Sequence, residues 1–333
     1  AVLASLLVAG RLSDHIGRRP VLVASTLAQV VARGVLSMAD GVCGLLAGRV
    51  IQGLATGAAV AAVGAGLLDI DRARGAIANA IAPISGTALG GLLGGLMVHF
   101  LPAPAHLVYL ALALVFLLQC LGLLRMSESL SRLPGALASL RPQFAVPPAV
   151  RASMLLAVPV LVAAWAVGGF YASLNPALLH RIFGFDASLV GGVALFLLAA
   201  SGAAAVLLLQ RSAPRAMMRF GAASLIGGMV VVLLSLWLRM APIYFLGTVV
   251  AGMGFGTGFQ GAIRSVMPLA AAHERAGVLS VLFAVSYLSM GLLAVMAGSL
   301  VAAGNPLLAT AQEFALMVML LAALALAGMR LQR

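Results

Sequence analysis

The chain of 333 residues contains no lysine, only eight acidic residues and only two cysteines. Charged residues make up 8% of the sequence, whereas about a quarter of a soluble domain is charged. Together with a hydrophobic share of 63% and a mean hydropathy of +1.15, this scarcity of charge excludes a set of soluble domains. Cys43 and Cys120 fall near opposite ends of their apolar segments, so we expect neither a disulfide between them nor a metal site.

Long apolar segments fill almost the whole chain. A bilayer core of roughly 30 Å requires about 20 apolar residues per helix. Eleven segments are present, at residues 1–10, 20–39, 41–68, 76–98, 107–124, 152–179, 187–210, 220–238, 240–263, 276–303 and 307–329. The first is short, and the chain begins on Ala1 rather than on methionine, so we expect it to start inside a helix. The sequence therefore predicts an all-α, polytopic transmembrane protein.

The basic residues are distributed unevenly along the chain. Twenty arginines against eight acids give a formal net charge of +12, which in a soluble protein would suggest nucleic acid. Sixteen of the 20 instead fall in alternate loops and at the C-terminus, on the side that the positive-inside rule assigns to the cytoplasm. We therefore expect a multi-pass protein of a bacterial inner membrane, embedded in the lipid bilayer, with a cytoplasmic C-terminus and no nucleic-acid partner.

The longest polar stretch contains four prolines and separates five apolar segments from six. This pattern predicts an N-terminal bundle over residues 1–124, a central cytoplasmic linker over 125–150 and a C-terminal bundle over 151–333. Two similar halves are a common plan for transporters.

The turn Gly10–Pro20, between the first two apolar segments, is unusually charged. Glycines let two helix ends approach closely, an aspartate can accept N–H groups at a helix start, and arginines can clamp acidic partners. We interpret the turn as a latch that holds the cytoplasmic side shut, formed by Gly10, Asp14, Gly17, Arg18 and Arg19. The alternative is that its two arginines only set the topology.

One arginine lies well inside an apolar segment. A charged guanidinium within a membrane helix costs about 2.5 kcal/mol or more unless it meets polar groups or water. Arg49 is in this position, and Gln52 follows one turn later on the same face, so both are functional candidates. Snorkelling toward the outer surface is the alternative for Arg49, and it is what we expect for Arg33.

Two apolar segments are rich in glycine. Glycines at four-residue intervals give a helix a smooth face for close packing against another membrane helix. Segment 76–98 has such a repeat and an adjacent glycine, at Gly86, Gly90, Gly91 and Gly94. Segment 240–263 has five glycines between 252 and 261, which favour bending. A gate and a tightly packed, static helix are both compatible with the second pattern.

Three stretches resemble motifs of the major facilitator superfamily. Gly10–Arg19 resembles its signature loop, Gly-x-Leu-Ala-Asp-Arg-x-Gly-Arg-Arg/Lys, and departs from it at Ser13 and His15. Arg49–Ala59 resembles the motif Arg-x-x-Gln-Gly-x-x-x-Gly-Ala. Gly86–Gly95 resembles the antiporter motif Gly-Pro-x-x-Gly-Gly, with threonine in place of proline. Because the signature loop follows the second helix in this family, the resemblance implies that the first helix is missing and about 11 helices are present.

The resemblance also implies a fold and several contacts. The fold would be two pseudo-symmetric six-helix bundles. Asp14 would approach the chain near Gly277, and Arg18 would pair with an acid at the inner end of the third apolar segment, either Asp69 or Asp71. Arg49 is associated with proton coupling in the family. The titratable carboxylate of such antiporters is often on the absent first helix.

Polar groups within the spans are few, and they are the candidates for a substrate cavity. An aromatic, weakly polar cavity suits lipophilic organic solutes better than sugars. The candidates are Gln29, Asn79, Trp165, Tyr171, Asn175, Gln260 and Tyr287, with ordinary helix packing as the alternative for each.

We expect a monomeric secondary transporter that exports a small organic solute in exchange for protons, resembling drug:proton antiporters. A proton symporter or facilitator that imports a nutrient such as an organic acid is the alternative. Acid–base, nucleophilic and metal-ligating residues are not clustered in the sequence, so we expect no enzyme, no catalytic residue and no cofactor.

Overall fold

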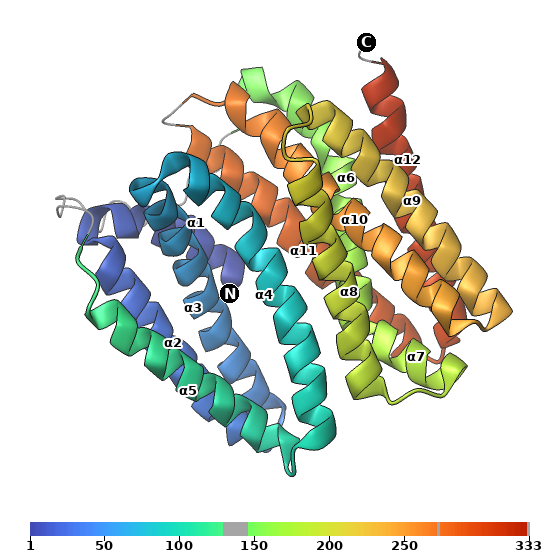
Figure 1. The fold of residues 1–333 in the computed structure, drawn as a ribbon, viewed down its shortest axis with the longest axis horizontal. Helices are drawn as coiled ribbons and strands as arrows, with labels where there is room; N and C mark the ends of the chain where they lie inside the picture. Colours follow the sequence, from blue (N-terminus) through green and yellow to red (C-terminus); the bar gives the residue numbers. More distant parts are fainter. Residues whose placement is uncertain (129–145, 272–273, 332–333) are drawn as a thin grey trace. The chain divides into compact units, whose positions relative to one another are not determined.

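The computed structural model describes residues 1–128, 146–271 and 274–331 (Figure 1). Its helices are α1 (Val2–Ile16), α2 (Arg18–Ser37), α3 (Val42–Ile70), α4 (Arg72–Phe100), α5 (Pro104–Leu124), α6 (Pro148–Ser173), α7 (Asn175–Phe183), α8 (Ala187–Leu208), α9 (Pro214–Leu238), α10 (Ala241–Val266), the short 3-10 turn η2 (Met267–Leu269), α11 (Arg275–Ala302) and α12 (Leu307–Leu331). The described residues contain no strand, and the all-α prediction is confirmed.

Ten helices in the described part of the chain, α2 to α6 and α8 to α12, are long and apolar enough to cross a bilayer. The apolar segment 152–179, expected to be one helix, instead forms α6 and α7, which meet at Leu174. Pro176 lies in the first turn of α7 and has no N–H with which to continue the hydrogen bonding of α6. Each of the other apolar segments coincides with one helix.

Contacts divide the chain into two compact units. Unit 1 comprises Ala1–Ala80 and Phe100–Gln143, and unit 2 comprises Ile81–His99 and Phe144–Arg333. Most of α4 therefore clusters with the helices that follow residue 144. The predicted N-terminal bundle, linker and C-terminal bundle stay a prediction, and residues 129–145 of that linker lie outside the described part of the chain.

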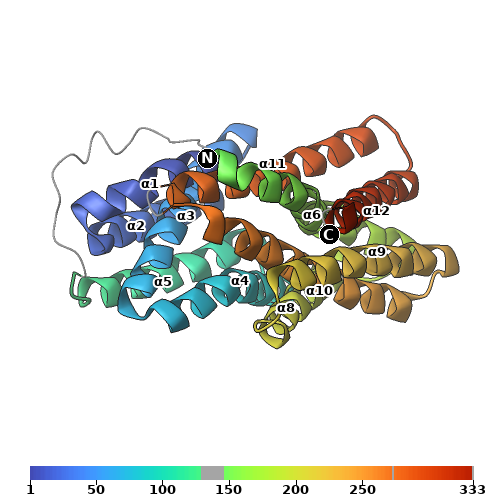
Figure 2. The ribbon, with the colours of Figure 1, turned by 90° about the horizontal axis from the view of Figure 1, so that it is seen from above.

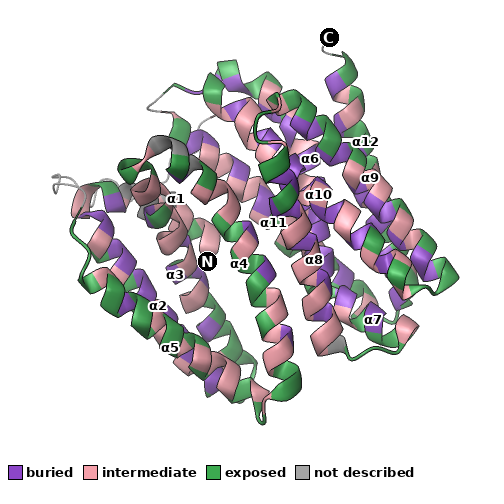
Figure 3. Ribbon diagram, in the orientation of Figure 1, coloured by how far each residue is buried: buried purple, intermediate pink, exposed green. Residues whose placement is uncertain are grey.

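In unit 1, α2 packs against both α3 and α5 (Figure 1). Its buried apolar side chains, among them Val21, Leu22 and Leu36, recur at helical spacing. Within α5 the pattern is different, because only Cys120 is buried. Figure 3 shows exposed and half-exposed residues along the rest of that helix. An apolar helix with so little protein cover is suited to lipid.

In unit 2, α10 is the central helix and packs against α6, α8 and α9; Figure 2 shows α9 and α10 side by side. Its glycines bring backbones into contact. A Cβ at Gly254 would lie 2.6 Å from the amide nitrogen of Leu225, and one at Gly256 would lie 2.5 Å from the carbonyl oxygen of Gly202. We call these contacts the α10 glycine contacts. Of the two alternatives for this segment, a gate and a tightly packed, static helix, these contacts fit the second.

Candidate functional site

The charged turn Gly10–Pro20, which we call the latch turn, joins α1 to α2 through a single residue. Gly10 lies within α1, and Gly17 is the linking residue. Gly17 has a φ of 103°, in a region that glycine adopts without strain, and its N–H donates to the Ser13 carbonyl at 3.2 Å. The glycine of the motif therefore has a backbone role at the point where the chain reverses.

Arg18 is the centre of the polar contacts around the latch turn. Its side chain is 7% exposed, and its Nε donates to Asp69 Oδ2 at 3.1 Å. Its Nη1 donates to Ser13 Oγ at 2.6 Å and also to the Asp14 carboxylate one helical turn back. One guanidinium thus joins the end of α1, the start of α2 and the end of α3. Two carboxylates offset the cost of burying this cation.

The geometry separates the two acids that the sequence left as alternatives. Asp69 reaches Arg18, whereas Asp71 lies 3.8 Å from Arg74 Nε in an exposed ion pair. Asp71 also accepts the Arg74 backbone N–H at 2.9 Å, so it supports the first turn of α4. Asp69 is therefore the acid in the position expected for the partner of Arg18. The expected approach of Asp14 to the chain near Gly277 stays a prediction.

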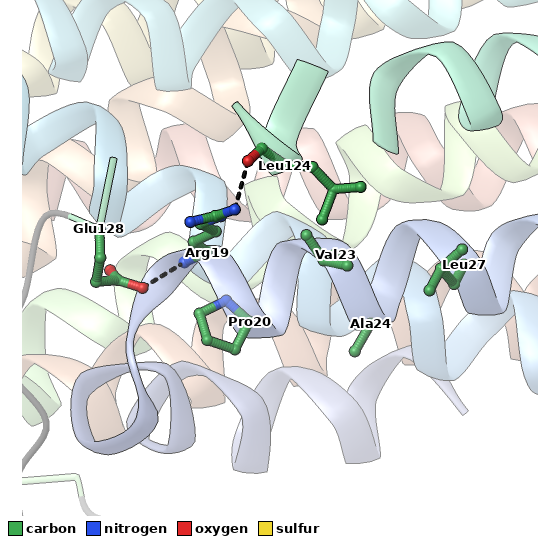
Figure 4. A pocket seen from close by; sticks show the side chains of 7 residues that line it. All are labelled: Arg19, Pro20, Val23, Ala24, Leu27, Leu124 and Glu128. Atoms are coloured by element: carbon green, nitrogen blue, oxygen red, sulfur yellow. Dashed lines mark hydrogen bonds between the residues drawn. The ribbon is translucent and has the colours of Figure 1, made fainter. Parts of the chain in front are cut away.

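Glu128, which our sequence analysis did not single out, also contacts the latch turn. Its carboxylate accepts the backbone N–H of Arg18 at 2.9 Å. It also accepts that of Arg19 at 3.1 Å (Figure 4), and these are the first amides of α2. A Cβ on Gly17 would collide with this carboxylate. The sequence shows Glu128 as an acid shortly after the end of an apolar segment. Its partners could not be predicted, because they lie about 110 residues away along the chain.

Arg19 makes the second contact between α2 and the end of α5. Its guanidinium donates to the carbonyl of Leu124, one of the last carbonyls of α5, where a cation is favourable. Arg19, Leu124 and Glu128 line an open groove of about 590 Å³, together with apolar side chains of α2 (Figure 4). The latch turn, which joins α1 and α2, is therefore tied to two other helix ends within unit 1, those of α3 and α5.

The proton-coupling candidates form a second polar group between α2 and α3. Arg49 Nη1 donates to Gln52 Oε1 at 2.9 Å, so the two share a face as predicted. Gln29 is 5% exposed and donates through Nε2 to Thr56 Oγ1 at 2.8 Å. Its Oε1 is buried without a hydrogen-bond partner among the described residues. Arg49 itself is exposed in unit 1. The coupling role of these residues stays a prediction.

Arg33 does not extend to a helix end as expected. The residue is 8% exposed, and its guanidinium carbon lies 5.4 Å from the centre of the Phe116 ring. Helix α5 covers this face of α2, so the side chain meets an aromatic face instead of water. Its Nε has no hydrogen-bond partner among the described residues.

The glycines of α4 pack on a different stripe from the predicted one. A Cβ at Gly91 would lie 3.1 Å from Leu195 of α8, and Gly95 approaches the backbone of Ser188 and Gly192. By contrast, a Cβ on the repeat Gly86, Gly90 and Gly94 would meet no described atom within 4 Å. Of the predicted glycines, only Gly91 is therefore in close contact. Helix α8 lies along the face that carries Gly91 and Gly95, one residue on from the predicted repeat.

Beyond these glycines, the end of α4 makes a polar contact with the residue that precedes α8. His99 Nδ1 lies 3.3 Å from Asp186 Oδ2. Asp186 also caps α8 by accepting the backbone N–H of Ser188 at 2.9 Å and of Leu189 at 3.2 Å. Hydrogen bonds from the Ser188 hydroxyl and the Leu189 amide lower the pKa of Asp186 to about 2.

The substrate-cavity candidates have three different environments. Tyr171 and Asn175 are 1% and 0% exposed and belong to the core of unit 2, where Tyr171 bonds Thr248 at 2.8 Å. Asn79 donates to the Gly64 carbonyl at 2.7 Å between α4 and α3. The remaining members of unit 2 are half-buried and lie on α6, α10 and α11, at Trp165, Gln260 and Tyr287. The five candidates of unit 2 therefore divide into an enclosed pair and a half-buried group.

Comparison with known proteins gives the class of this chain. Residues 1–295 match the Major Facilitator Superfamily, so the chain belongs to that family, as the three motifs predicted. Among solved structures, the human organic anion transporter MFSD10 (TETRAN) superposes with a TM-score of 0.70 at 20% identity, covering 100% of this chain and 81% of that one. This likeness confirms the expected fold.

Two curated relatives share higher identity over part of the chain. The tetracycline resistance protein, class C, of Escherichia coli is 38% identical over 100 residues, which cover 28% of this chain and 25% of that protein. The tetracycline resistance protein, class G, of Vibrio anguillarum is 38% identical over 123 residues, which cover 34% and 30%. The matched part of the chain thus spans between a quarter and a third of each relative's length.

Proposed function

We propose that this protein is a secondary transporter of a bacterial inner membrane that exports small organic solutes in exchange for protons by alternating access. The observation that carries this proposal is the buried Arg18 held by Asp14 and Asp69 where three helices meet. Such a contact is stable while the helix ends stay together and can be exchanged for water when they separate. The two tetracycline resistance relatives support efflux as the direction.

In this mechanism the latch turn closes the cytoplasmic side, and Arg49 with Gln52 takes part in proton coupling. Asp14 would leave Arg18 and engage the chain near Gly277 when that side is shut. Charges inside a membrane span are weakly screened. The position of a guanidinium there can therefore change when a nearby group gains or loses a proton. The protein acts as a monomer, with the solute and protons as its only partners besides lipid.

Tetracycline flux into proteoliposomes tests this function. With an acidic interior, an antiporter accumulates tetracycline as protons leave, whereas a proton symporter does so only with an acidic exterior. A facilitator responds to neither gradient. We expect accumulation with the acidic interior and its loss in Arg49→Ala, while Arg330→Ala, which removes an exposed arginine at the end of α12, transports normally. Absence of flux across a broad solute panel would refute transport.

The orientation can be tested with cysteines at two exposed positions near helix ends. In a background of Cys43→Ser and Cys120→Ser, we expect Arg181→Cys in α7 to react with an impermeant maleimide in intact cells. Arg215→Cys, at the start of α9, should react only after the cells are opened. Equal labelling of both from one side would contradict the multi-pass arrangement.

A further inference from the structure

Unit 2 contains two groups of aromatic side chains with different surroundings. In the first, Phe170, Tyr171 and Tyr244 are each at most 1% exposed. The two hydroxyls of this group are satisfied, because Tyr171 bonds Thr248 at 2.8 Å and Tyr244 donates to Asn175 at 2.5 Å. Enclosed rings with paired hydroxyls belong to a packed core, and this group offers no contact to a ligand.

The second group surrounds Trp165 and is more open. The Trp165 ring centre lies 4.8 Å from that of Tyr287, 5.4 Å from Phe259 and 6.2 Å from Phe255. Phe283 joins the group through Phe259 and Tyr287, at 6.1 and 6.3 Å. All five residues are half-buried rather than enclosed. We call them the Trp165 cluster.

The Trp165 cluster has an unsatisfied hydrogen-bond donor. The indole Nε1 of Trp165 is buried and has no hydrogen-bond partner among the described residues. Buried indole N–H groups usually have an acceptor, and the neighbouring rings of Phe255 and Phe259 carry none. The donor on α6 therefore lies in one cluster with half-buried rings of α6, α10 and α11.

The depth of the cluster also fits a transport site. Phe255 and Tyr287 lie near the middle of α10 and α11 respectively, and Trp165 contacts both. Transporters of this general plan hold their substrates near the bilayer midplane. At this depth, an acceptor brought by a solute would meet a donor that has no partner among the described residues.

We propose that the Trp165 cluster binds planar aromatic solutes that carry a carbonyl or enolate oxygen at the ring edge. The solute stacks against Trp165 and Tyr287, and its oxygen accepts the Trp165 N–H. This inference names the substrate class and therefore rests on the proposed function. The specificity comes from one hydrogen bond in an otherwise apolar contact.

Two probes that differ only in the carbonyl group test the inference. Xanthone has a carbonyl oxygen at the edge of its ring system, whereas xanthene has a CH2 group there; the ring ether oxygen is common to both. Their binding to the protein in nanodiscs is measured by equilibrium dialysis, with empty nanodiscs subtracted. Trp165→Phe keeps an aromatic ring but removes the N–H. Trp237→Phe is the matched control, because Trp237 is 79% exposed near the end of α9.

We expect Trp165→Phe to weaken xanthone binding by about fivefold, the effect of one neutral hydrogen bond, and to leave xanthene binding unchanged. Trp237→Phe should change neither. Equal weakening of both probes would mean that only apolar contact matters, and no effect would exclude Trp165; either result overturns the proposal, as does absence of xanthone binding above empty nanodiscs.

Tetracycline flux separates this inference from the proposed function. If xanthone does not bind while pH-driven flux is normal, the substrate class is wrong and the transporter remains. If xanthone binds as expected while no solute is transported, the proposed function is wrong and the binding site remains. Thermal unfolding of unit 2, followed in each variant by the fluorescence of the remaining tryptophan, reports whether that unit is folded.

Discussion

Unit 1 joins its helices at the latch turn through charged groups, whereas unit 2 joins its helices at the α10 glycine contacts through the backbone itself. Arg18, two carboxylates and Glu128 connect the ends of α1, α2, α3 and α5. The α10 glycine contacts lie along the length of a helix, and their neighbours in unit 2 are neutral. The first kind of contact is local and polar, and the second extends along whole helices.

The difference indicates which parts can separate and which move as a body. The carboxylates paired with Arg18 are partly exposed, so they can exchange this contact for water. Backbone contacts at glycine are lost only if whole helices slide, since neighbouring interiors are close-packed. We therefore expect motion at the latch turn and rigidity around α10. Each unit has its own probe of unfolding: Trp165 fluorescence in unit 2, read in a Trp237→Phe background, and Cys120 reactivity in unit 1, read in a Cys43→Ser background.

The largest expected effect is that of a methyl group at an α10 glycine contact. Gly256→Ala places a Cβ against the backbone of Gly202, which cannot rotate away, so we expect unit 2 to lose about 2 kcal/mol. Gly86→Ala is the control, because no described atom lies within 4 Å of its Cβ. Thermal unfolding followed by Trp165 fluorescence should separate the two variants. Similar midpoints would show that the glycines of α10 are not tightly packed in solution.

The second effect concerns the centre of the latch turn. Arg18→Ala leaves Asp69 without its partner, and because these carboxylates are partly exposed we expect a loss of about 1 kcal/mol in unit 1, with abolished flux. Arg18→Lys keeps the charge but not the forked donor set, so its flux should be partly retained. Asp14→Asn should impair flux without preventing membrane insertion.

Double substitution sharpens this test. Once Arg18 is alanine, Asp69→Asn should add little, because the interaction that it removes is already lost. Additive increases in Cys120 reactivity would show that Arg18 and Asp69 do not act as a pair.

A smaller effect is expected at Glu128. Glu128→Ala removes an acceptor from the first amides of α2, and we expect a loss of about 0.5–1 kcal/mol in unit 1. Glu128→Gln keeps an acceptor but not the charge, and should lie between Ala and the parent. If Cys120 reactivity on heating is unchanged in each of the two variants, Glu128 does not stabilise the latch turn.

The sequence could predict the helices, the latch turn and the family, because hydrophobic length and charged motifs are local patterns. It could not choose between Asp69 and Asp71, since that choice depends on which acid the buried Arg18 reaches at the end of α3. It also missed Glu128, whose partners are about 110 residues away. The glycine stripe of α4 was placed one residue off, because the repeat fixes a periodic face but not which neighbour covers it.

The smallest effect is expected where unit 2 has its own charged helix end, at Asp186. Because its folded pKa of about 2 lies below the usual 3.8, ionised Asp186 contributes stability above about pH 4 that is lost as the pH falls toward 2. In Asp186→Asn this acid-dependent part should vanish, while most of the cap at pH 7 is retained because asparagine also caps helices.

Substitutions at Ser188 and His99 test which contact contributes more to the lowered pKa of Asp186. The Ser188 hydroxyl is the largest cause of this pKa shift, and the contact with His99 is the smallest. The unfolding midpoint of unit 2, followed by Trp165 fluorescence, should fall as the pH is lowered from about 4 toward 2. We expect Ser188→Ala to reduce this fall more than His99→Gln does. The reverse order would mean that the link between α4 and α8, rather than the cap of α8, sets the charge of Asp186, and unit 2 would then depend on an ionic contact much as unit 1 does.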